Sequence, residues 1–106
     1  MTTTLDRLEA TIRARRNGDP AASYVARLTA DGRARMARKL GEEAVETVVA
    51  AMEGDAAAVT SEAADLIFHL AVLLADMGLS LDAVMAELDR REGVSGIAEK
   101  AARAKE

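Results

Sequence analysis

The stretch from residue 63 to residue 75 constrains the fold most, because Asp65 and His69 are its only polar side chains. At about 100° per residue, the apolar side chains of this stretch cover almost every direction around a helix. We therefore expect a helix that is buried nearly all round. Glu62, Asp65 and His69 project from one side of that helix, and these polar groups need a partner because burying an unpaired carboxylate is costly.

Turn and capping residues divide the chain into helices, so the fold class that we predict is all-α. Thr4 is the expected cap of a first helix of about three turns, and Asp55 and Ser80 are expected caps of later ones. The other expected helices span residues 21–30, 35–53 and 56–77, with a further one after Ser80. Regular structure should end near Gly93 to Gly96, and the tail 97–106 should be mobile unless it docks on something. The prediction is a single domain, residues 1–106, built as a small bundle of four to five helices.

The composition favours packed helices over sheets and also favours self-association. Phe68 and Tyr24 are the only aromatic residues, so the interior must consist of Ala, Val, Leu, Ile and Met. A chain of 106 residues buries a modest core, which predicts a homodimer that forms a larger bundle. The absence of cysteine excludes disulfides, thiolate zinc sites and cysteine nucleophiles.

Charge and hydropathy argue against a nucleic acid polymer or a membrane as a partner. The net charge is −4, and the basic residues are scattered rather than gathered on one face. The first ten residues lack the apolar segment of a secretory signal, and the apolar run 66–75 is too short to span a bilayer. We therefore expect a soluble cytoplasmic protein, for which a single nucleotide stays open as a ligand.

Two pairs of acidic residues predict a metal site between two helices. Glu43 and Glu46 form one pair, Glu62 and Asp65 form the other, and fifteen residues separate the pairs. Two antiparallel helices joined by the short turn at residues 54–55 would bring these pairs opposite each other. Mg²⁺ prefers oxygen ligands and removes the repulsion between neighbouring carboxylates. The spacing therefore predicts a magnesium site with four carboxylate ligands.

Simpler interpretations of the same residues stay open at this stage. A Glu-x-x-Glu pair alone is usually a solvated charged face, and Glu62 and Asp65 have a structural alternative in ion pairs with Lys39, Arg38 or Arg35. A lone histidine on an apolar helix is more often a hydrogen-bonded residue behind a site than a metal ligand. A di-iron site would require Glu-x-x-His on two helices, and this chain has one histidine.

The sequence resembles the all-helical nucleotide pyrophosphohydrolases, whose pattern is E-E-x-x-E, a gap, then E-x-x-D. Residues 42–46 and 62–65 match that pattern. Within this group, the segments Ser23-Tyr24 and Arg38-Lys39-Leu40-Gly41, together with the ending that carries Lys100 and Arg103, resemble the phosphoribosyl-ATP pyrophosphohydrolases over nearly the whole chain. Val25 departs from the resemblance, because a threonine is expected after Ser-Tyr.

The resemblance implies hydrolysis of phosphoribosyl-ATP to phosphoribosyl-AMP and pyrophosphate, the second step of histidine biosynthesis, by a magnesium-dependent cytoplasmic homo-oligomer. The expected metal ligands are Glu43, Glu46, Glu62 and Asp65, and Glu42 joins them in the expected catalytic group. The expected substrate contacts are Lys39, Arg38, Ser23, Tyr24, Lys100 and Arg103.

His69 is interpreted as a residue that supports the ligands from behind. Two other functions stay open: hydrolysis of noncanonical nucleoside triphosphates, and a non-catalytic helical dimerisation module whose acids form ion pairs between subunits.

Overall fold

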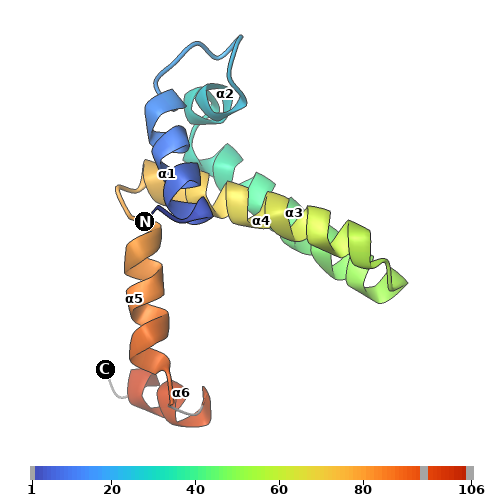
Figure 1. Ribbon diagram of the computed structural model, residues 1–106, viewed down its shortest axis with the longest axis vertical. Helices are drawn as coiled ribbons and strands as arrows, with labels where there is room; N and C mark the ends of the chain where they lie inside the picture. Colours follow the sequence, from blue (N-terminus) through green and yellow to red (C-terminus); the bar gives the residue numbers. More distant parts are fainter. Residues whose placement is uncertain (1, 94–95, 105–106) are drawn as a thin grey trace.

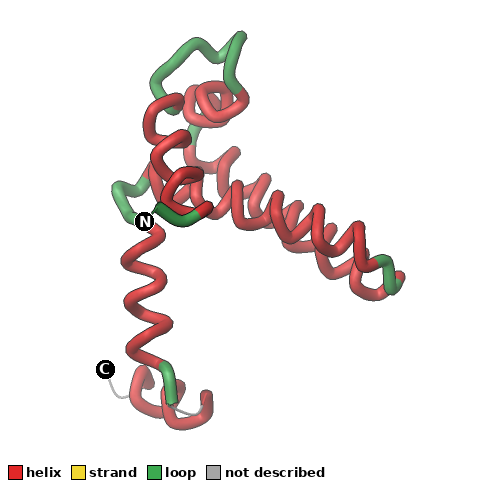
Figure 2. The backbone as a smooth tube through the Cα atoms, in the orientation of Figure 1, coloured by secondary structure: helices red, strands yellow, loops and turns green. Residues whose placement is uncertain are grey.

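The computed structural model describes residues 2–93 and 96–104, and within these ranges every regular element is an α-helix (Figures 1 and 2). The helices are α1 (Thr4–Arg15), α2 (Tyr24–Asp31), α3 (Arg33–Glu53), α4 (Ala56–Asp76), α5 (Leu81–Arg91) and α6 (Gly96–Ala104). The predicted all-α fold class is confirmed. The described residues contain a sixth helix, beyond the four to five expected, and it lies in the tail.

The antiparallel pair of α3 and α4 is the longest part of the structure. Each helix is 21 residues long, and the two lie side by side (Figure 1). Gly54 ends α3 in the left-handed conformation, with φ at 72°, which costs a residue with a side chain about 1 kcal/mol. Asp55 begins α4 as predicted, because its side chain accepts a hydrogen bond from the Ala58 amide at 3.1 Å. This short turn fixes which residues of the two helices face each other.

The hydrophobic core lies at the end of this pair away from the turn, where α1 and α2 pack against it (Figure 1). Val25 stands where the resembled family suggests a threonine, and its side chain is only 6% exposed. This position therefore contributes packing rather than a hydroxyl contact with a ligand. The buried core side chains come from five helices and are Ile12, Val25, Leu28, Met36, Ala71, Val72 and Leu81.

α2 begins later than predicted, at Tyr24 rather than near residue 21. The residues before it form a turn in which the Ala21 amide donates to the Asp19 side chain at 2.9 Å. Ser23 is extended, with φ −135° and ψ 126°, and its hydroxyl oxygen accepts a hydrogen bond from the Ala26 amide. The turn around Asp19 therefore delays the helix until Ser23 can cap it.

The other boundaries differ by smaller amounts. Thr3 rather than Thr4 caps α1, because the Thr3 hydroxyl accepts from the Asp6 amide while the Asp6 carboxylate accepts from the Thr3 amide. α3 begins at residue 33 rather than 35, and α4 ends at residue 76 rather than 77. Gly96 begins α6 instead of ending regular structure, and residues 94–95 lie outside the described residues.

α4 is not buried all round, so that prediction is wrong. Its buried residues are His69, Ala71 and Val72, and Ile67 is 43% exposed. A helix that is apolar on every side needs neighbours on every side. One chain supplies α3 along its length and α1 near its end, so other faces of α4 remain open.

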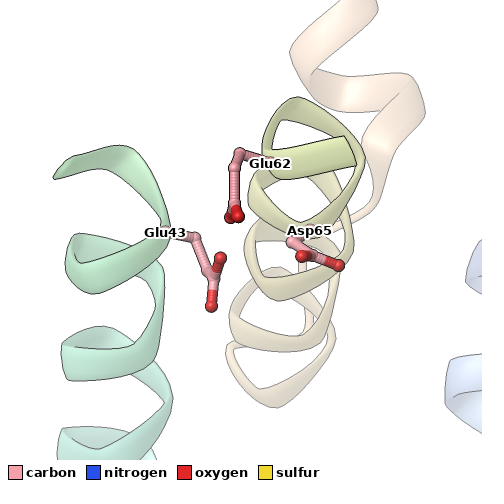
Figure 3. A group of neighbouring side chains, drawn as sticks. All are labelled: Glu43, Glu62 and Asp65. Carbon is pink, nitrogen blue, oxygen red and sulfur yellow. The ribbon is translucent and has the colours of Figure 1, made fainter. Parts of the chain in front are cut away.

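By length and composition alone, α4 would be able to cross a membrane. It nevertheless carries Glu62 and Asp65 in its middle (Figure 3), and charged residues are expensive in the hydrocarbon region. It also packs against α3. These features identify α4 as a helix of the bundle.

α5 projects from the rest of the molecule as an arm, and α6 lies at its far end (Figure 2). The radius of gyration is 16.0 Å, whereas a compact chain of this length has a value of about 13 Å. The Glu9 carboxylate fixes the base of the arm, because it accepts a hydrogen bond from the Leu81 amide at 2.9 Å and pairs with Arg13 at 2.8 Å. Ser80 caps α5 as predicted, accepting from the Ala83 amide.

Asp76 joins three helices next to the core. Its carboxylate lies 2.8 Å from Arg33 Nε on α3 and 3.0 Å from Nη2 of Arg16, which directly follows α1. The hydrogen bonds from Arg33 and then Arg16 lower the pKa of Asp76 below its ordinary value. A lowered pKa means that the stabilisation is present above the ordinary value and is lost as the pH falls through the lowered one.

Replacing Asp76 with alanine should lower the free energy of unfolding by about 1–3 kcal/mol, because two guanidinium groups lose their shared partner. Urea denaturation of both proteins measures the difference. Asp89→Ala removes an exposed carboxylate from α5 and should change stability by less than about 0.5 kcal/mol. Equal effects of the two substitutions would show that the Asp76 ion pairs contribute no more than an ordinary surface charge.

Candidate metal centre

Three carboxylates meet between α3 and α4. Glu43 comes from α3, whereas Glu62 and Asp65 come from α4 (Figure 3). Each residue offers one carboxylate oxygen, and these three oxygens lie within 4.8 Å of one another. We call Glu43, Glu62 and Asp65 the acid group.

The turn at Gly54 explains this meeting by simple counting. Glu43 lies eleven residues before Gly54 and Asp65 lies eleven residues after it; Glu46 and Glu62 lie eight residues before and after it. In an antiparallel helix pair, residues at equal distances from a short turn lie at the same level along the two axes. The spacing of the acidic pairs therefore places all four residues in neighbouring layers of the helix pair.

The acid group contains buried oxygens without hydrogen-bond partners. Glu43 is only 7% exposed, and the Oε2 atoms of Glu43 and Glu62 are both buried and unpaired. A buried polar atom without a partner typically costs about 1–3 kcal/mol, and more if the group is charged. A hard divalent cation prefers such oxygens as ligands and offsets their repulsion. These residues therefore suit a metal ion such as Mg²⁺.

The carboxylates also disfavour one another's ionisation. The neighbouring Glu46 carboxylate, followed by burial, raises the pKa of Glu62 to about 7. Burial is the main cause that raises the pKa of Glu43, followed by Glu46. Without a cation, Glu43 and Glu62 therefore retain protons that isolated carboxylates would lose. A metal ion competes with these protons for the same oxygens.

Glu46 lies beside the acid group rather than within it. It is exposed, and it lines a cavity of about 260 Å³ together with Glu62 and Glu53. Its role as a fourth ligand stays a prediction. Glu53 was not identified from the sequence, although it follows Glu46 by seven residues, which is the spacing of one helix face.

Lys39 is the cation nearest to Glu43 in the described part of the chain. Its Nζ lies 3.2 Å from Glu42 Oε2 and 4.0 Å from Glu43 Oε1. Glu42 is the largest cause that raises the pKa of Lys39, so the ammonium stays charged. Among the described residues, no ion pair joins Glu62 or Asp65 to Lys39, Arg38 or Arg35. Ion pairs with Lys39 therefore offset the charge of Glu42 and part of that of Glu43. They do not offset the charges of Glu62 and Asp65.

His69 and Tyr24 form a hydrogen-bonded pair behind Asp65. The Tyr24 hydroxyl lies 3.0 Å from His69 Nε2, and His69 Nδ1 lies 2.8 Å from the Asp65 carbonyl oxygen. The interpretation of His69 as a residue that supports a ligand stays a prediction, because its bond reaches the backbone of Asp65 and not the carboxylate. No local sequence signal indicates the contact with Tyr24, because the two residues are 45 positions apart.

The remaining expected substrate contacts occupy different places. The Ser23 hydroxyl oxygen caps α2, and Arg38 is exposed next to Lys39 on α3. Lys100 and Arg103 belong to α6, which lies at the end of the α5 arm, far from the α3–α4 pair (Figure 1). The fold of one chain therefore does not bring the tail residues to the acid group.

An all-α fold with carboxylates opposed across an antiparallel helix pair defines the class of all-helical nucleotide pyrophosphohydrolases. The chain belongs to the phosphoribosyl-ATP pyrophosphohydrolase family, whose model matches residues 5–92. It is 67% identical over 105 residues to the phosphoribosyl-ATP pyrophosphatase of Rhizorhabdus wittichii, covering 99% of each chain. The enzyme of the same name from Erythrobacter litoralis is 65% identical over 94% of this chain and 96% of its own. That of Novosphingobium aromaticivorans is 62% identical over 93% and 92%.

The raised pKa of Glu62 predicts how the metal-free protein responds to pH. A folded-state pKa of about 7, above the ordinary 4.5, contributes stability below pH 4.5 that is lost as the pH rises through 7. The melting temperature of metal-free wild type should therefore fall between about pH 5 and about pH 8. Glu62→Gln stays neutral, so its melting temperature should fall less over this interval.

Magnesium provides the complementary test of the same group. At about pH 8, above the pKa of Glu62, adding Mg²⁺ should raise the melting temperature of wild type more than that of Glu62→Gln. Differential scanning calorimetry measures both effects. The interpretation of the acid group would be contradicted if the melting temperatures of the two proteins changed equally with pH and rose equally with Mg²⁺.

Proposed function

We propose that this chain hydrolyses phosphoribosyl-ATP to phosphoribosyl-AMP and pyrophosphate, the second step of histidine biosynthesis. Its family membership and its full-length similarity to enzymes named phosphoribosyl-ATP pyrophosphatase support the proposal. The observation that carries it is the acid group, whose oxygens lie within 4.8 Å of one another and include two buried, unpaired atoms. Such a group suits a cation that binds a triphosphate.

Magnesium is the cofactor that we propose. Glu43, Glu62 and Asp65 would hold it, with Glu46 as a further ligand at the edge of the group. The chemistry that magnesium supplies when bound is positive charge against the phosphate oxygens and a more acidic coordinated water. The other tasks in the reaction belong to side chains of the protein.

Lys39, Glu42 and Glu46 have separate tasks in this proposal. The Lys39 ammonium, next to Glu43, offsets phosphate charge at the edge of the acid group. Glu42 orients that ammonium through the 3.2 Å contact, which fits this task better than a role as general base. The exposed Glu46 carboxylate lies beside Glu62, which supports its proposed task as a further ligand at the edge of the group.

The functional unit that we propose is a homodimer. Four exposed apolar side chains follow one face of α3 at helical spacing, and their exposed fractions range from 49% to 83%. A second copy would cover this stripe and the open faces of α4, which explains why a helix so apolar is exposed in one chain. The stripe consists of Val45, Val48, Val49 and Met52.

The ligand is a single small nucleotide, and the enzyme acts in the cytoplasm without a membrane or nucleic acid polymer as partner. The net charge of −4 opposes binding to a polyanion. The packing of α4 against α3 supports a soluble bundle.

Pyrophosphate release from phosphoribosyl-ATP tests the activity. Wild type should require Mg²⁺, and Glu62→Gln should lose about 100-fold or more in kcat/KM, because several kcal/mol of charge stabilisation depends on the metal. Glu92→Gln makes the same change at an exposed position at the end of α5 and should retain activity. Preferential turnover of dUTP or dCTP would support the role in clearing noncanonical triphosphates. No turnover of any nucleotide would support a non-catalytic module.

Introducing charge into the α3 stripe tests the dimer. Wild type should sediment at twice the chain mass of 11.2 kDa. The double variant Val48→Glu/Met52→Glu should sediment at the mass of one chain, because two carboxylates would be buried without partners. Ala86→Glu, on an exposed face of α5, is the matched control. A double variant that still dimerises would place the interface elsewhere.

A further inference from the structure

The hydrogen bonds of His69 fix where its proton lies. The Asp65 carbonyl oxygen, 2.8 Å from Nδ1, can only accept, so Nδ1 must donate. In the neutral imidazole, Nε2 is then an acceptor, and the Tyr24 hydroxyl at 3.0 Å must donate to it. His69 is only 5% exposed, so its position behind Asp65 is closely confined.

This arrangement decides what the Tyr24 oxygen can offer to a ligand. Its proton is used by His69, so the free positions on the oxygen are lone pairs. Tyr24 is 44% exposed. The phenol is also close enough to Lys39 to contribute, after Glu42, to the raised pKa of that lysine. The oxygen therefore presents an acceptor that is linked through His69 to the backbone of Asp65 and that influences the pKa of Lys39.

Packing alone gives an incomplete explanation of the pair. The Tyr24 ring stacks on Phe68 at a centroid distance of 6.1 Å, and His69 contacts both rings edge-on. A phenylalanine at position 24 would keep these ring contacts. The hydroxyl, by contrast, matters only for its hydrogen bonds.

We propose that His69 is a positioning residue that orients the Tyr24 hydroxyl oxygen as a hydrogen-bond acceptor for a ribose hydroxyl of the nucleotide substrate. This inference rests on the proposed function. Phosphate oxygens are themselves acceptors, so an acceptor-only phenol disfavours them. The ribose that carries the triphosphate offers hydroxyl donors close to the phosphates, and Tyr24 is linked through His69 to the backbone of Asp65, one of the proposed metal ligands.

Three variants separate the two hydrogen bonds of His69. Tyr24→Phe removes only the hydroxyl. His69→Asn can keep a donor near the Nδ1 position, facing the Asp65 carbonyl, but loses the acceptor for Tyr24. His69→Gln can instead place an acceptor near the Nε2 position.

Steady-state kinetics of the magnesium-loaded variants should show a defect in binding. Tyr24→Phe and His69→Asn should each raise KM for phosphoribosyl-ATP by about 3- to 10-fold with little change in kcat, the effect of one lost hydrogen bond. The KM of the double variant should be no higher than that of the more impaired single variant, because both substitutions remove the same interaction. The KM of His69→Gln should lie closer to that of wild type. Lower thermal stability with unchanged KM would show a purely structural role and overturn the proposal.

Substrate analogues identify the group that Tyr24 contacts. Wild type should lose about 3- to 10-fold in kcat/KM on an analogue of phosphoribosyl-ATP that lacks the 2′- or the 3′-hydroxyl of the triphosphate-bearing ribose. Tyr24→Phe should no longer distinguish one of these analogues from the parent. Equal discrimination by wild type and Tyr24→Phe for both analogues would overturn the proposal.

Failure of the proposed function would give a different result, namely no turnover of phosphoribosyl-ATP by wild type. Calorimetric binding of ATP, 2′-deoxy-ATP and 3′-deoxy-ATP, each with Mg²⁺, to wild type and Tyr24→Phe then decides the role of Tyr24. If wild type binds ATP more tightly than a deoxy analogue and Tyr24→Phe does not, that role is supported. An unchanged preference, or no binding of any of the three, overturns it.

Discussion

The repulsion among carboxylates between α3 and α4 is the interaction around which the structure is organised. Helix pairs normally place apolar side chains along their contact, yet this pair places Glu43 and Glu62 there, with the exposed Asp65 next to them. Two of their oxygens are buried without partners. The cost must be offset elsewhere in the fold, and a bound cation would relieve it.

The rest of the chain holds this unfavourable arrangement in place. The Gly54–Asp55 turn sets the register, and the core, which is built from α1, α2, α3, α4 and α5, lies at the opposite end of the pair. Asp76 joins the helices near that core through Arg16 and Arg33. Stability is therefore concentrated at one end of the helix pair, while the acids occupy its middle. The acid group therefore lies apart from the core.

The sequence predicted the features that depend on residues close together in the chain. The caps at Asp55 and Ser80, the α3–α4 turn and the opposition of the acids all follow from local spacing. The exposure of α4 was not predicted, because helical periodicity does not reveal how many neighbours one chain supplies. The late start of α2 depends on which side chain, Asp19 or Ser23, accepts hydrogen bonds from the free backbone amides. The Tyr24–His69 bond links residues 45 positions apart and has no local signal.

Anomalous diffraction from crystals grown with Mn²⁺ shows directly whether Glu43, Glu62 and Asp65 bind a metal ion. Mn²⁺ shares the oxygen-ligand preference of Mg²⁺ and gives a measurable signal. We expect an anomalous peak bounded by the carboxylates of Glu43, Glu62 and Asp65, with the two unpaired Oε2 atoms among the ligands. Absence of a peak there, with the three carboxylates instead paired to lysine or arginine side chains, would contradict the claim that these residues form a metal centre.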